Sequence, residues 1–158
     1  MEREATLPTI GEALAPVVAR TAPEHLPLLV ALAERLAAVR YREWAAADAA
    51  HAATLRACAE REEDIAIRVE RLYPDAAAIE REIRNATPDL DTINRTLFAG
   101  RPLADQFRIQ ARGERLGAAT WRAFAKRESD PGRREVLLAC AGLEEESAAV
   151  LEGILAEA

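Results

Sequence analysis

The chain has 158 residues, half of them hydrophobic, with 21 basic and 27 acidic side chains and a net charge of −6. This size suits one domain, and the charges are interspersed without a basic stripe, which argues against a nucleic-acid partner. Aromatic residues make up only 4%, while alanine and leucine dominate the apolar set, as is typical of helices. We find no apolar run long enough for a signal peptide or a membrane span, so we expect a soluble, cytoplasmic protein.

Residues 1–22 are expected to form an N-terminal arm with one short helix, and residues 23–158 a single all-α domain. Two short helices are predicted within residues 75–99, the second capped by Thr87 with Pro88 at its first helical position. Asp48 is the expected N-cap of the second long helix. The four predicted long helices cover residues 27–47, 49–73, 102–127 and 131–155.

An internal repeat relates the first two long helices to the last two. Residues 34–45 and 114–125 are identical at six of twelve positions, and residues 57–70 and 139–152 at seven of fourteen. Both helices of one hairpin therefore recur, in order, in the second. Two hairpins joined by a long connection predict a four-helix bundle with one crossover, the arrangement of ferritin-like folds.

Each half of this repeat carries two glutamates on otherwise apolar helical faces. Positions three, four and seven away from each glutamate are apolar except for Gln110 and Ser147, and none is lysine or arginine. Each glutamate lies about 14 or 15 residues from the turn of its hairpin, roughly 21 Å along the helix, so the members of a pair fall at the same height. The four residues are Glu34, Glu62, Glu114 and Glu144.

Four ionised carboxylates in a dry core need counter-charge, because an unpaired buried charge is very costly. Two divalent cations would supply it, and carboxylate oxygens suit iron or manganese. The competing interpretation is that some of these side chains reach the surface, or are protonated and hydrogen-bonded.

The pattern resembles the ferritin-like superfamily, and most closely its rubrerythrin-type members, over about residues 28–155. Glu34 and Glu114 are similar to the single glutamates of that family's first and third helices, while Glu62 and Glu144 match the glutamates of its Glu-x-x-His motifs. The resemblance implies two iron or manganese ions bound by these four glutamates, with redox chemistry on dioxygen or peroxide. It also implies that Tyr41 donates its phenol to a carboxylate ligand from outside the coordination sphere.

The chain departs from that family at the histidines. Ile65 and Ser147 stand where histidine is expected, and neither His25 nor His51 is placed to substitute. The chain also lacks the cysteine pairs of a rubredoxin-like domain. A second interpretation therefore stays open, in which a metal-free ferritin-like bundle acts as an oligomerising or binding module. Whether the protein is an enzyme, and whether it forms homo-oligomers, is likewise left open.

The two cysteines occupy matching repeat positions, each four residues before a glutamate. We expect Cys58 and Cys140 to be buried thiols that share one layer of the core. In that layer they are either small buried apolar groups or, if their helices approach closely, a redox pair.

Overall fold

The computed structural model describes residues 7–157 and confirms the prediction of an all-helical chain. Seven α-helices and two short 3₁₀ helices account for the regular structure of this range, in which no strand occurs. None of the helices within residues 7–157 combines the length and the apolar character that a membrane span requires. Residues 1–6 of the predicted N-terminal arm, and residue 158, lie outside the described residues.

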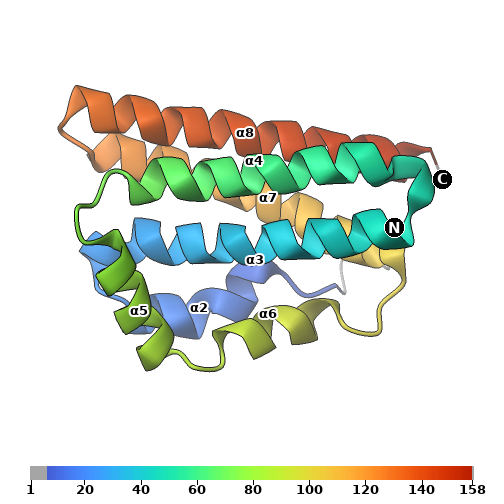
Figure 1. Ribbon diagram of the computed structural model, residues 1–158, viewed down its shortest axis with the longest axis horizontal. Helices are drawn as coiled ribbons and strands as arrows, with labels where there is room; N and C mark the ends of the chain where they lie inside the picture. The colour runs from blue at the N-terminus through green and yellow to red at the C-terminus, as the bar shows by residue number, and fades with distance from the viewer. Residues whose placement is uncertain (1–6, 158) are drawn as a thin grey trace.

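Four long helices lie along one another and form the body of the molecule (Figure 1). Helix α3 packs against α4, α7 against α8, and α4 against α8, while hydrogen bonds from Tyr41 and Trp44 join α3 to α7. Neighbouring helices run in opposite directions (Figure 1). Each hairpin reverses the chain, and the crossover runs back from the end of α4 to the other end of the molecule, where α7 begins. These helices are α3 (Leu26–Ala47), α4 (Ala52–Glu70), α7 (Leu103–Arg127) and α8 (Pro131–Ala156).

The remaining helices cover one side of this group. The crossover holds α5 (Ala76–Ala86) and α6 (Leu90–Phe98), and the N-terminal segment holds α2 (Ile10–Arg20). Helix α2 packs against both α6 and α7, and α5 packs against α3. Figure 1 shows all three on the side of α3 that faces away from α4 and α8, so they close the α3–α7 face of the long helices.

The structure corrects two of the predicted helix caps. Asp48 does not cap α4 directly, because a 3₁₀ turn, Ala49–His51, comes between them, and its carboxylate instead lies 2.8 Å from His51 Nδ1. Thr87 does not cap α6 either: its hydroxyl donates to the carbonyl of Ile83 at 2.6 Å and so completes the end of α5. A threonine hydroxyl can hydrogen-bond to backbone groups before or after it in the chain, so the sequence alone does not show which helix end it caps.

The apolar core divides into two clusters at opposite ends of the long helices. The first cluster contains Leu28, Leu32 and Trp121, with Cys140 among them. The second contains Tyr41, Trp44, Leu55, Phe107 and Leu151, with Cys58 among them. Trp44 is the centre of the second cluster, with edge-to-face contacts to Tyr41, Phe98 and Phe107 at centroid distances of 5.1–5.8 Å.

We expect Leu55→Ala to lower the free energy of unfolding by about 2–5 kcal/mol, because the side chain is fully buried and truncation leaves a cavity. Leu138→Ala is the matched control, since this leucine is 48% exposed on α8 and its loss should change stability by no more than about 0.5 kcal/mol. Urea unfolding of both variants measures the difference. Similar effects at the two positions would contradict the assignment of Leu55 to the core.

A candidate metal centre between the long helices

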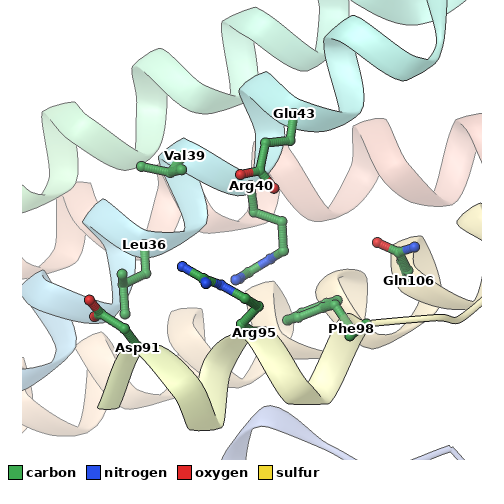
Figure 2. A pocket seen from close by; sticks show the side chains of 9 residues that line it. Leu36, Val39, Arg40, Glu43, Asp91, Arg95, Phe98 and Gln106 are labelled. Carbon is green, nitrogen blue, oxygen red and sulfur yellow. The ribbon is translucent and has the colours of Figure 1, made fainter. Parts of the chain in front are cut away.

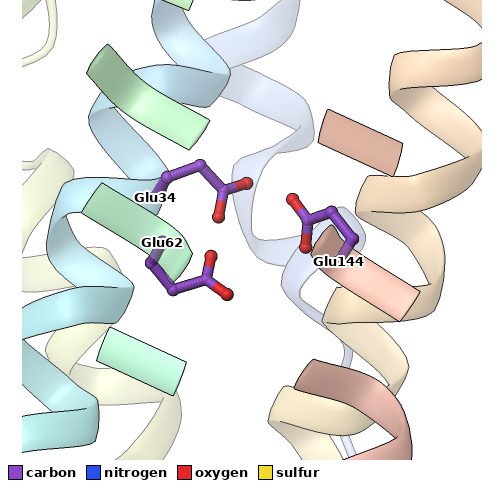
Figure 3. A group of neighbouring side chains, drawn as sticks. All are labelled: Glu34, Glu62 and Glu144. Atoms are coloured by element: carbon purple, nitrogen blue, oxygen red, sulfur yellow. The ribbon is translucent and has the colours of Figure 1, made fainter. Parts of the chain in front are cut away.

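The structure brings all four predicted glutamates together in the layer between the two apolar clusters. Each comes from the middle of a different long helix, and none is more than 7% exposed. Glu34, Glu62 and Glu144 converge (Figure 3), and one carboxylate oxygen from each lies within 4.8 Å of those of the other two. Glu114 lies beside them, close enough to Glu62 and Glu144 for carboxyl–carboxyl hydrogen bonds.

Two of the carboxylates are held in place by donors from the surrounding helices. Glu114 Oε1 accepts hydrogen bonds from the Tyr41 hydroxyl and from Gln110 Nε2, both at 2.7 Å. Glu144 Oε1 accepts from Trp121 Nε1 at 3.0 Å. These donors fix the orientation of each carboxyl group before any ligand arrives. Sequence reasoning placed Tyr41 near a carboxylate but missed the indole donor of Trp121.

Other carboxylate oxygens in the layer have no such partner. Both oxygens of Glu62, and Oε2 of Glu114, are buried without a hydrogen-bond donor among the described residues. The groups within hydrogen-bonding reach of Glu62 are Glu34 and Glu114, and one carboxyl can donate to another only when it carries a proton. An unsatisfied buried polar group costs free energy, and an unsatisfied charge costs more. The layer therefore requires either protons or a cation.

Without a bound metal, only protons can satisfy these buried oxygens, and burial favours the protonated form of the carboxyl groups. It raises the pKa of Glu62 and of Glu144 well above the ordinary value of 4.5, and the negative charges of the neighbouring glutamates raise both further. Burial raises the pKa of Glu34 as well, while hydrogen bonds to Glu62 and Glu144 oppose that rise. A divalent cation would reverse this tendency, because it favours the ionised form of every carboxylate that contacts it.

A buried arginine that sequence reasoning missed lies next to this layer. Arg40 Nε and Nη2 donate to Gln110 Oε1 at 3.1 and 2.7 Å, and Gln110 in turn donates to Glu114. Burial lowers the pKa of Arg40 to about 10, so it stays cationic at neutral pH. Arg40 lies six residues after Glu34, off the helical face of that glutamate, and its counterpart in the repeat is Thr120. Neither the periodicity nor the repeat could have found it.

The positions where histidine was expected are buried but offer little to a metal. Ile65 is fully buried in the first apolar cluster. Ser147 is also fully buried, and its hydroxyl accepts a hydrogen bond from Arg61 Nε at 3.0 Å. His51 lies at the start of α4 between Asp48 and Glu157, far along the helix from Glu62. The carboxylates are thus the oxygen ligands this layer can provide.

Cys58 and Cys140 are both buried free thiols, but the prediction that they share one layer is wrong. Cys58 belongs to the second apolar cluster and Cys140 to the first. Because α4 and α8 run in opposite directions (Figure 1), moving four residues back from the glutamate leads in opposite directions along the molecule. The two thiols therefore lie on either side of the carboxylates, which excludes a redox pair between them.

Small residues leave room for the carboxylates and for a narrow space beside them. A Cβ atom on Gly117 would come within 2.7 Å of the Glu144 carboxyl carbon, so this position needs glycine while the carboxyl keeps its place. A cavity of about 50 Å³ reaches Glu34, Glu114 and Glu144 from the α3–α7 face. Ile10 and Leu14 of α2 line its outer side, so α2 covers the side from which the carboxylates are reached.

Fold and site together define a class: an all-helical protein with a buried cluster of glutamates between four long helices. No protein-family model matches the chain. Comparisons with curated proteins and with solved structures likewise find no match. The chemistry of the site is therefore the ground on which a function can be proposed.

We expect the metal-depleted protein to lose stability as pH rises above about 4.5. A carboxyl whose pKa is raised by folding stabilises the fold below its ordinary pKa, and that contribution is lost as pH rises through the folded-state value. Burial raises the pKa of Glu62 in this way. Glu62→Gln, which stays neutral, should therefore gain stability relative to the wild type with rising pH. Urea unfolding from pH 4.5 to 8 measures the two slopes.

Glu63→Gln is the control for this comparison. Glu63 is adjacent in sequence but forms a surface ion pair with Arg42 at 2.8 Å, so its variant should keep the pH slope of the wild type. Parallel slopes for wild type and Glu62→Gln would show that folding does not raise the pKa of Glu62.

Proposed function

We propose that the chain is a ferritin-like protein of the rubrerythrin type, whose four glutamates bind a pair of iron or manganese ions. The observation that carries the proposal is the state of Glu62, whose two oxygens are fully buried without a donor while oxygens of Glu34 and Glu144 lie within 4.8 Å of one of its own. Two divalent cations would balance four carboxylates and satisfy those oxygens in one step. Oxygen-only ligands favour iron or manganese over softer metals such as Cu(I).

The arrangement of the long helices supports the same proposal. Two hairpins joined by a long crossover, with one inward glutamate from each helix, is the architecture in which bundle proteins build carboxylate-bridged metal pairs. In this chain Tyr41 and Gln110 would hold Glu114, and Trp121 would hold Glu144, at the positions the ligands require. Ile65 and the two apolar clusters would keep bulk water from the layer.

A bound metal pair would supply redox chemistry with dioxygen or peroxide, the activity that the family resemblance implies. The protein's own contribution would be to hold four charged ligands in a dry layer and to orient two of them by hydrogen bonds. With Ile65 and Ser147 in place of histidines, water would complete the coordination. The proposal does not specify whether the protein forms homo-oligomers.

The second candidate function is a metal-free ferritin-like bundle that acts as an oligomerising or binding module. The apolar surroundings of Ile65 favour it, since an imidazole ligand is missing where the family places one. In this candidate the carboxyl groups are protonated and hydrogen-bond to one another, in line with their raised pKa values. The two candidates differ in their response to added metal.

We expect Mn²⁺ or anaerobic Fe²⁺ to stabilise the metal-depleted wild type, by about 2.7 kcal/mol at a hundredfold excess over the dissociation constant. Glu62→Gln should lose this gain, because an amide cannot balance the cation's charge, while Glu63→Gln should keep it. Thermal unfolding with and without metal, together with elemental analysis, measures both effects. A wild-type melting temperature that ignores metal, with none retained on analysis, would favour the metal-free module.

A second variant tests the geometry without removing a ligand. Gly117→Ala adds a methyl group within 2.7 Å of the Glu144 carboxyl carbon and should weaken metal binding about tenfold or more by displacing that carboxyl. Gly142→Ala on α8 is the matched control, since its added methyl group meets no atom within 4 Å. Titration calorimetry with Mn²⁺ measures both. Equal affinities for the two variants would place the bound metal away from Glu144.

A further inference from the structure

A second cavity lies outside the carboxylate layer, between α3 and α6. It has a volume of about 370 Å³, within the range of small-molecule sites. Figure 2 shows it from close by, with side chains of both helices turned into it. The residues that matter for its chemistry are Leu36, Val39 and Arg40 from α3 and Asp91, Arg95 and Phe98 from α6.

The inner wall of this cavity carries a buried cation that forms no direct ion pair among the described residues. Arg40 is 9% exposed, and its guanidinium carbon lies 3.9 Å from the centroid of the Phe98 ring. It donates one hydrogen bond to Asn94 and two to Gln110, which use three of its five N–H groups. No carboxylate among residues 7–157 forms an ion pair with it. The glutamates of the carboxylate layer act on its charge from beyond ion-pair distance, and the N–H groups that no amide uses can still bind an anion.

A second cation stands on the facing wall. Arg95 is exposed on α6, and Figure 2 shows its guanidinium group turned toward that of Arg40. Its side chain forms no hydrogen bond or ion pair within the part of the chain that the structure describes. Two like charges that face each other across a cavity repel, and an anion between them would remove that repulsion.

The rest of the cavity is partly apolar and partly acidic. Leu36, Val39 and Phe98 form an apolar surface, and Val39 is 54% exposed. Glu43 and Asp91 are exposed residues of the lining, and their charges would repel a ligand with several negative groups. The walls thus suit one anionic group on an apolar body, and disfavour phosphate dianions and nucleotides.

We propose that this cavity binds a small amphipathic monocarboxylate. Its carboxylate lies between Arg40 and Arg95, where guanidinium groups can bind both oxygens, and its hydrocarbon part covers Leu36, Val39 and Phe98. The proposal needs no metal, since none of these side chains is a glutamate of the carboxylate layer. It therefore stands or falls separately from the proposed function.

The test is titration calorimetry of the wild type with straight-chain carboxylates from acetate to octanoate. Affinity should rise about fourfold for each added methylene until the cavity is filled, as expected when each one is buried. Alkylammonium ions of the same lengths should bind at least tenfold more weakly, because two arginines would repel them. Absence of binding at every chain length, equal affinity for the two charge types, or affinity independent of length would overturn the proposal.

Variants locate the bound carboxylate. Arg95→Ala should weaken hexanoate binding about tenfold, and Val39→Asp should weaken it further by placing a negative charge on the apolar wall. Arg56→Ala removes another exposed arginine, from α4, and should leave affinity unchanged. Equal losses in the Arg95 and Arg56 variants would show a general effect of charge and contradict the site. The titrations are made on metal-depleted and metal-supplemented protein, and binding that requires metal would move the ligand to the carboxylate layer.

Discussion

The cost of keeping four carboxyl groups out of water is the constraint on which the middle of this molecule depends. Glu62, Glu114 and Glu144 are at most 1% exposed, and each would lose the hydration of its charge on folding. Hydrophobic side chains of the same volume would pack there without that cost. A chain that places one glutamate on each of four helices, at one height, keeps an arrangement that packing alone does not favour, and this is the ground for proposing a bound cation there.

The carboxyl groups of the layer differ in their hydrogen-bond partners. Glu114 accepts hydrogen bonds from Tyr41 and Gln110, and Glu144 accepts one from Trp121. Glu62 receives none, although the pKa of Glu62 and the pKa of Glu144 are both raised well above the ordinary value. The layer therefore contains two carboxyl groups that neighbouring donors hold in place, and Glu62, for which only a proton or a cation can satisfy both oxygens. This asymmetry is absent from the repeat, where Glu62 and Glu144 are equivalent.

The sequence could predict features whose position along the molecule does not depend on the direction of a helix. It failed on features whose position does depend on that direction. A glutamate in the middle of its helix stays at the same height whichever way the partner helix runs, so the meeting of the four glutamates followed from counting residues to each turn. Cys58 and Cys140 lie one turn away from that middle, and the opposite directions of α4 and α8 carry them to different clusters. The helix positions were predictable from apolar periodicity and proline, whereas Thr87 required knowledge of which helix end its hydroxyl serves.

Arg40 shows most clearly why the rest could not be predicted. Its partners, Asn94 and Gln110, are 54 and 70 residues away, so only the packing of α6 and α7 against α3 brings them together. Because Gln110 accepts from Arg40 through its carbonyl oxygen, its amide nitrogen is left to donate, and that nitrogen donates to Glu114. The arginine therefore sets the direction of the amide, and through it supplies one of the two donors on that carboxylate. An anion on the outer side of Arg40 would be separated from the carboxylate layer by a single side chain, with the guanidinium charge shared between the two sites.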